Sequence, residues 1–190
     1  MEWFRSVILR SLGDTLDLLK DDENYIHMKL PINKISRKFE DKLKEKINSN
    51  IKKINIRNAT RSDANNFIQL HKNIWSTTTM PYKPFSKEIV ENLIEDPNII
   101  FLIANVNDKD VGFAIIHYAG KHNQIGIITA LGIISEFQRK GFGTKLGLEI
   151  WKYFKKKGLE ELNCRVSKDN TKAYLFIKSL GFEEFDDYLG

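Results

Sequence analysis

Cysteine, proline and long apolar runs are scarce in this chain of 190 residues, which has one cysteine and four prolines. The single cysteine, Cys164, cannot form an internal disulfide, and its apolar surroundings predict a buried, unreactive thiol suited to a reducing cytosol. No apolar run approaches the roughly 20 residues that a membrane-spanning helix needs. Residues 1–12 are interrupted by Glu2, Arg5 and Arg10, which does not fit a signal peptide. These absences predict a cytoplasmic protein without membrane contact.

Clustered metal ligands, internal repeats and low-complexity segments are also missing from the sequence. The histidines and the cysteine do not have the spacing of metal ligands, so no metal is expected. The surplus of positive charge is modest, because 30 Lys and Arg oppose 25 Asp and Glu to give +5. Such a surplus suits an anionic ligand but is too small to indicate a nucleic-acid-binding protein.

Residues 1–53 are predicted to form a helical, basic N-terminal extension. Apolar residues recur at helical spacing through residues 3–19, and residues 35–47 place an apolar side chain at every fourth position. Between residues 29 and 53, nine basic residues oppose three acidic ones, a local net charge of +6. This pattern fits a solvent-exposed helix face, an arm that docks an acidic partner, or a helix pair that forms a homodimer. The sequence leaves all three open.

Residues 54–190 alternate between strand and helix patterns and predict one α/β (α+β) domain. Thr60 followed by Asp63 has the form of a helix-capping box, and Ser86 is expected to cap the next helix, which ends before Pro97. Strands are expected at residues 54–57, 99–106, 111–118, 125–133, 162–166 and 182–188, and later helices at residues 143–157 and 171–180.

The turn over residues 131–144 is the most informative segment for function. It leads from an apolar strand into an amphipathic helix, and Gly141 and Gly143 stand where the helix begins. Glycine lets the backbone approach a ligand closely, and the first N–H groups of a helix have no partner within it. Because the helix dipole is positive there and Arg139 and Lys140 add charge, the turn suits an anion such as a pyrophosphate. The alternative is a plain strand-to-helix turn with glycines for tightness.

This segment resembles motif A of the GNAT superfamily of acyl-CoA-dependent N-acyltransferases. Gln138, Gly141 and Gly143 fill the positions of its signature, which is Gln or Arg, two residues, Gly, one residue, and Gly or Ala. A second group of residues resembles the family's motif B, which runs from an asparagine to a closing Gly-Phe: Asn170, Ala173, Phe176, Gly181 and Phe182. Two motifs in register are more specific than either alone. The resemblance covers residues 54–190.

The resemblance implies a mixed, mostly antiparallel sheet with helices on both faces. Two parallel strands, at residues 125–133 and 162–166, would splay apart and hold acyl-CoA between them. The Asn170 side chain would lie near the pantetheine amides or the thioester. Main-chain groups of the first strand would pair with the pantetheine arm, from Leu131, Gly132 and Ile133. Amide groups of the turn would hold the pyrophosphate, from Gln138, Arg139, Lys140, Gly141, Phe142, Gly143 and Thr144.

The sequence departs from the family at both of the usual proton carriers. Ile177 stands where many members have a tyrosine that protonates the departing thiolate, and Arg165 stands nearest to the family's glutamate base. Tyr174, which lies one helical turn before Ile177, is the predicted replacement for the acid. A relay through His117 or Tyr118, and a reaction that relies on proximity and solvent, are the alternatives.

Two functions follow from the resemblance. The first is an N-acetyltransferase that moves an acetyl group from acetyl-CoA to a primary amine by direct attack on the thioester. The second is an acyl-CoA-binding module with little or no activity. Residues 63–96 would set the acceptor, and the aromatic residues Tyr82 and Phe85 of the loop at residues 75–85 could line its pocket. A peptide amine and a small-molecule amine both stay open.

Overall fold

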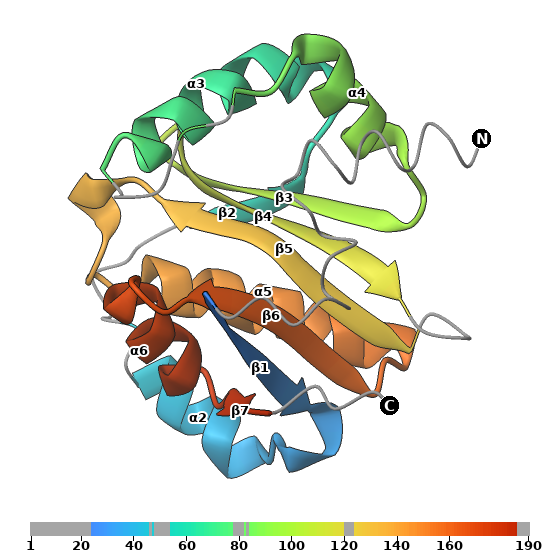
Figure 1. The fold of residues 1–190 in the computed structure, drawn as a ribbon, viewed down its shortest axis with the longest axis vertical. Helices are drawn as coiled ribbons and strands as arrows, with labels where there is room; N and C mark the ends of the chain where they lie inside the picture. The colour runs from blue at the N-terminus through green and yellow to red at the C-terminus, as the bar shows by residue number, and fades with distance from the viewer. Residues whose placement is uncertain are drawn as a thin grey trace.

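The computed structural model describes residues 24–45, 47, 54–77, 82, 84–119 and 124–185. Its centre is one seven-stranded sheet in the order β2-β3-β4-β5-β6-β1-β7 (Figure 1). All neighbouring strands are antiparallel except β5 and β6, which run parallel. The strands are β1 (Tyr25–Pro31), β2 (Asn55–Asn58), β3 (Ile99–Val106), β4 (Lys109–Ala119), β5 (Ile125–Ile133), β6 (Glu161–Ser167) and β7 (Glu183–Glu184).

Helices cover both faces of the sheet, as the sequence predicted. The α-helices are α2 (Arg37–Glu45), α3 (Ala64–Trp75), α4 (Lys87–Glu95), α5 (Phe142–Lys157) and α6 (Thr171–Ser179). Short 3-10 helices are η2 (Ile32–Lys34), η3 (Arg61–Asp63) and η4 (Ser135–Phe137). Helices α3 and α4 pack on the face toward which Phe113 and Ile115 of β4 point, whereas α2, α5 and α6 pack on the face of Ala114 and Ile116. Alternate residues of one strand therefore serve two cores.

The N-terminal segment contains a strand where a helix was expected. β1 pairs antiparallel with β6 along its whole length and with β7 on its other edge. Its residues alternate, so that Met28 and Leu30 are buried in the core beneath α5 while Lys29 between them is half-buried on the opposite face. The prediction of helix is thus wrong over Tyr25–Pro31, because alternation with period two suits a pleated strand.

The second half of the expected extension does form a helix. In α2, Leu43 is buried in the same core as Met28, and Phe39 packs against that core. Trp151 of α5 donates its indole N–H to the Glu40 carboxylate at 3.0 Å, which joins α2 to α5. We infer from this shared core that the folded domain includes residues 25–45. The helix expected at residues 3–19 lies outside the described residues, as does the end of the last expected strand, of which β7 is the described part.

The entry into α3 follows the capping signal of the sequence. Asp63 accepts hydrogen bonds from the Thr60 N–H at 2.7 Å and from the two guanidinium nitrogens of Arg57 at 2.7 and 2.8 Å. The Arg57 hydrogen bond, followed by those from Thr60, holds the pKa of Asp63 well below its usual range. Ser86 likewise caps α4 by accepting a hydrogen bond from the Ile89 N–H at 3.2 Å.

A histidine is buried in an aromatic cluster on the inner face of α3. His71 is 4% exposed, and its ring centroid lies 4.3 Å from that of Trp75, 4.8 Å from that of Phe85 and 5.8 Å from that of Phe67. Its Nδ1 atom has no hydrogen-bond partner among the described residues. Burial lowers the pKa of His71 to about 4, because the imidazolium would lose its hydration in this apolar setting.

We expect His71 to make the free energy of unfolding depend on pH. Unfolded histidine has a pKa of about 6.5, so between about pH 6.5 and pH 4 the unfolded chain binds a proton here that the folded chain does not. Stability should therefore fall as pH decreases through this window, and His71→Phe should flatten that slope. Urea unfolding from about pH 7 to pH 4 measures it. Phe67→Leu, a control without a titrating group, should lower stability with the slope unchanged. A slope that survives His71→Phe contradicts the prediction.

Candidate active site

The two parallel strands separate halfway along their length. Residues of β5 and β6 pair from Ile125 with Glu161 to Ile128 with Cys164, and the pairing stops there. Both strands continue, β5 as far as Ile133 and β6 as far as Ser167. Figure 1 shows the strands diverging toward their C-terminal ends. Beyond Ile128 their facing backbone groups have no partner across the gap, so an extended ligand could supply one.

A β-bulge at Thr129 coincides with the separation. Ile116 of β4 pairs with Ile128 and Ile115 pairs with Ala130, which leaves Thr129 as an extra residue in β5. Its hydroxyl donates a hydrogen bond to the Ile115 carbonyl at 3.0 Å, which fixes the bulge to β4. A bulge bends its strand and increases the local twist, so β5 turns away from β6 directly after their last paired residues.

The bulge also decides which way the predicted coenzyme-binding residues of β5 face. Leu131 and Ile133 pack in the core beneath α5, whereas Gly132 faces α3. A Cβ atom at Gly132 would lie 2.8 Å from the Ile74 side chain, so glycine is required where α3 crosses β5. The main chain of residues 131–133 lies in the part of β5 that has no partner on β6.

Two hydrogen bonds of Gln138 stabilise the turn that follows β5. Its side-chain amide donates to the Ile133 carbonyl at 2.8 Å, and its own N–H donates to the Ser135 carbonyl at 3.1 Å. The side chain and the amide of this predicted pyrophosphate ligand are therefore both engaged in the turn. Arg139 and Gly141 have positive φ angles of 56° and 85°, which reverse the chain into α5.

The first turn of α5 follows the turn at Gln138 and lies against α6. The first bond along the helix runs from the Lys145 N–H to the Gly141 carbonyl at 3.0 Å, and Gly141 contributes no side-chain cap. The amides of Phe142, Gly143 and Thr144 precede that bond, so they lack partners within the helix and lie at its positive end. A Cβ atom at Gly143 would lie 2.9 Å from the Phe176 ring, so glycine also lets α6 approach this turn.

The two predicted site residues of α6, Asn170 and Tyr174, make different contacts. Asn170 caps the helix, because its side-chain oxygen accepts from the Ala173 N–H at 3.1 Å. The Tyr174 hydroxyl donates to the Glu184 carboxylate on β7 and accepts from Lys178 at 2.9 Å. Since β7 lies two strands beyond β6, this hydroxyl is bonded on the side of α6 that faces away from the gap.

The alternative proton carriers lie on opposite faces of β4. His117 pairs with Ile127 of β5, on the face away from α5. Tyr118 packs edge-on against Phe154 of α5, and burial together with the neighbouring Tyr153 raises its pKa. A phenol with a raised pKa keeps its proton at neutral pH and is a poor relay.

Cys164 does not have the properties of a nucleophile. The residue is buried, and burial raises the pKa of its thiol to about 12. Catalysis by a cysteine requires the thiolate, which is scarce at neutral pH with such a pKa. The thiol is therefore a core side chain, as the sequence predicted.

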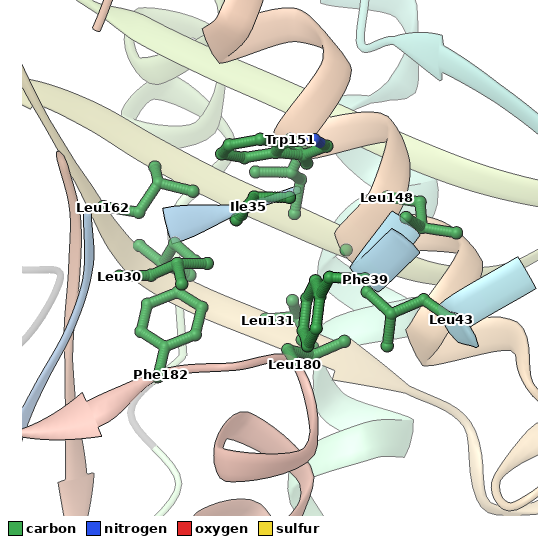
Figure 2. Close-up of a pocket in the computed structure, with 13 residues that line it drawn as sticks. Leu30, Ile35, Phe39, Leu43, Leu131, Leu148, Trp151, Leu162, Leu180 and Phe182 are labelled. Carbon is green, nitrogen blue, oxygen red and sulfur yellow. The ribbon is translucent and has the colours of Figure 1, made fainter. Parts of the chain in front are cut away.

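An apolar pocket lies on the α5 face of β5 and β6 (Figure 2). Leu131 of β5 and Leu162 of β6 form its floor, and Trp151 of α5 and Phe39 of α2 stand over it. The side chains that line it are all apolar, apart from the indole N–H, and they are Leu30, Ile35, Phe39, Leu43, Ile128, Leu131, Gly147, Leu148, Ile150, Trp151, Leu162, Leu180 and Phe182. A charged amine would lose its hydration here without compensation, so this face does not suit its entry.

Two features are absent from the part of the chain that the structure describes. No three His, Cys, Asp or Glu side chains there come together as they would around a metal ion. Within the same ranges, no helix combines the length and the apolar character that crossing a membrane requires.

Known proteins are similar to this chain in sequence. An uncharacterized N-acetyltransferase, MJ1207, of Methanocaldococcus jannaschii is 28% identical over 141 residues, which cover 70% of this chain and 62% of that protein. The mycothiol acetyltransferase of Renibacterium salmoninarum is 35% identical over 103 residues, or 53% of this chain and 30% of that protein. The chain thus spans less than two thirds of the length of either relative.

A solved structure with bound coenzyme has the same fold. The PaiA N-acetyltransferase of Thermoplasma acidophilum, in complex with coenzyme A, matches with a TM-score of 0.64 and 25% sequence identity. The match covers 72% of this chain and 94% of that protein. The model of the Acetyltransferase (GNAT) family matches residues 66–182, which is more than half of the chain. The chain therefore belongs to the GNAT family of acetyltransferases.

Proposed function

We propose that the protein is an N-acetyltransferase that transfers the acetyl group of acetyl-CoA to a primary amine. The observation that carries the proposal is that β5, after its pairing with β6 ends at Ile128, leads through a short turn into the N-terminus of α5, which has no side-chain cap. A ligand with an extended amide arm and a diphosphate fits these two features together. The names of the relatives and the coenzyme A held by PaiA support the same co-substrate.

Each part of the coenzyme has a counterpart in the site. The diphosphate would accept hydrogen bonds from the amides of residues 139–144, beside the positive charges of Arg139 and Lys140. The pantetheine amides would pair with the edge of β5 at residues 131–133, where the Ile133 carbonyl already accepts a hydrogen bond from Gln138. Asn170, which caps α6, would border the same gap from the β6 side.

The transfer itself needs the movement of two protons. The neutral amine attacks the thioester carbon, a C–N bond forms, the C–S bond breaks, the nitrogen loses a proton and the sulfur gains one. Ile177, at the position of the expected acid, is buried in the core, and its aliphatic side chain has no acidic proton to donate. Holding the amine and the thioester together supplies a large part of the rate in such reactions, and solvent can then exchange both protons.

A second candidate function is acyl-CoA binding without turnover. Ile177 and Arg165 at the two proton-carrier positions favour it, because neither side chain transfers a proton at neutral pH. Acetyl-CoA-dependent release of free CoA thiol separates the two functions. We expect the full chain to release thiol with at least one amine from a panel of amino carboxylates, their amides, polyamines, amino sugars and peptides. Tight CoA binding without release, over the whole panel, would instead support the binding module.

Gly141 tests whether the start of α5 holds the coenzyme. Its φ of 85° strains a β-branched side chain, so Gly141→Val should disturb the turn and raise the Kd for CoA about tenfold or more. Gly158, at the other end of α5, provides a matched control because its φ is 71° and a Cβ atom there would meet nothing within 4 Å. Gly158→Val should cost comparable stability and leave the Kd unchanged. Calorimetric titration with CoA measures both, and equal Kd values for the two variants would contradict the assignment.

Tyr174 tests the proton donor. Because its hydroxyl is bonded to Glu184 and Lys178 on the outer side of α6, we expect Tyr174→Phe to lower kcat by less than about threefold. Lys178→Gln, which disturbs the same group of side chains without removing the phenol, is the control. Steady-state kinetics with the amine found above gives the comparison. A loss of about a hundredfold in kcat for Tyr174→Phe alone, with unchanged CoA affinity, would identify Tyr174 as the acid.

A further inference from the structure

The apolar pocket lies beside the point at which β5 and β6 stop pairing (Figure 2). Ile128, the last residue of β5 that pairs with β6, lines it together with Leu131 of the stretch beyond and Leu162 of β6. All three side chains belong to the core on the α5 side of the sheet. The pocket therefore adjoins, on this face, the end of the gap at which the two strands come together.

The pocket is small, and it suits an apolar occupant. Its cavity volume is about 20 Å³, which holds one water-sized group, such as a methyl or a methylene, and excludes a long chain. The side chains that line it are apolar, and the indole N–H of Trp151 is already donated to Glu40 at 3.0 Å. Apolar cavities exclude water, so an apolar group that enters supplies contacts that the walls otherwise lack.

A glycine of α5 and the side chains of α2 shape the wall opposite the sheet. A Cβ atom at Gly147 would lie 3.0 Å from the Leu180 side chain, so a larger residue there would press into the pocket wall. α2 contributes Phe39 and Leu43. These two residues precede the range 66–182 over which the family model matches, so this wall belongs to the chain's own N-terminal part.

The proposed path of the coenzyme leads to this pocket. With the diphosphate at the start of α5 and the pantetheine arm along residues 131–133, the thioester end would come to the place where β5 and β6 pair. An acyl group cannot continue between hydrogen-bonded strands, so it must turn toward one face of the sheet. The α5 face offers apolar side chains to a hydrocarbon group, and the amine is left with the other face.

We propose that this pocket receives the end of the donor's acyl group, and that the protein therefore prefers propionyl-CoA to acetyl-CoA. The inference rests on the proposed acyl transfer, in which the same C–N bond forms and the same C–S bond breaks when the acyl group has three carbons. One additional carbon buried among these side chains corresponds to about a fourfold gain in affinity. Longer acyl groups exceed the cavity, so their affinity falls again.

A series of donors tests the proposal by binding alone. The full chain is titrated calorimetrically with CoA, acetyl-CoA, propionyl-CoA, butyryl-CoA and hexanoyl-CoA in the absence of any amine. We expect the Kd for propionyl-CoA to be about fourfold lower than the Kd for acetyl-CoA, and the Kd for hexanoyl-CoA to be higher than that for propionyl-CoA. With an amine that reacts, kcat/KM should follow the same order of donors.

Two variants change the pocket in opposite directions. Gly147→Ala adds a methyl group at the pocket wall, so the ratio of the Kd for acetyl-CoA to that for propionyl-CoA should fall from about four to about one. Phe39→Leu enlarges the cavity, so the tightest donor should become butyryl-CoA. Phe101→Leu is the matched control, because Phe101 is buried in the other core, beneath α3 and α4, and it should leave the order of donors unchanged. Thermal unfolding establishes that each variant is folded.

The outcomes of the inference and of the proposed function are distinguishable. Equal Kd values for acetyl-CoA and propionyl-CoA, or a propionyl preference that survives Gly147→Ala, overturn the inference and leave coenzyme binding standing. A Kd that falls steadily from acetyl-CoA to hexanoyl-CoA also overturns it, because the cavity holds one small group. Absence of binding for every form of the coenzyme overturns the proposed function and the inference with it. A propionyl preference that is lost in Gly147→Ala and kept in Phe101→Leu supports the pocket.

Discussion

The pairing of β5 with β6 ends directly before Thr129, and the rest of the candidate site depends on this separation of the two strands. The extra residue inserted opposite Ile115 and Ile116 bends β5 while its hydroxyl keeps it bonded to β4. Parallel strands that had continued to pair would have satisfied each other's backbone groups and left no edge for a ligand. Because they stop at Ile128 and Cys164, the remaining residues of β5 have no partner on β6, and the chain runs from them through the Gln138 turn to the start of α5.

The N-terminal strand β1 contributes apolar side chains to one face of the sheet beside this gap and polar side chains to the other. β1 lies between β6 and β7, so β6 is an interior strand with neighbours on both sides. Its alternation sends Met28 and Leu30 into the core beneath α5, where burial of each stabilises the fold by about 1.5–3 kcal/mol. The same alternation places Lys29 beside Arg165 on the other face. One strand thus helps to close the apolar side and to supply charge on the polar side.

Arg165 and Ile177 occupy the two positions where the family commonly has a proton carrier. Neither side chain exchanges a proton at neutral pH, so the proposed transfer would depend on alignment of the reactants and on the electrostatic environment.

The sequence by itself determined the helix N-terminus, the glycine turn and the order of elements after residue 54. These are local features, because capping by Thr60 and Asp63, the turn at Gly141 and the periodicity of α5 each depend on neighbours within a few residues. The two motifs around Gln138 and Asn170 gave the family for the same reason. Only the tertiary structure decided where distant segments meet.

Three features depended on such distant contacts. β1 is a strand because it pairs with β6, which places Met28 and Leu30 in the core. In the sequence, Pro31 and the helical spacing of the residues on both sides of it hid this alternation. The bulge leaves no mark in the sequence beyond one polar residue, Thr129, in an apolar strand, because a bulge is defined by its partner strand. The direction of the Tyr174 hydroxyl was likewise settled by Glu184, which reaches it through the pairing of β7 with β1. Pairing between strands far apart in the chain is a property of the packed sheet, and no local pattern encodes it.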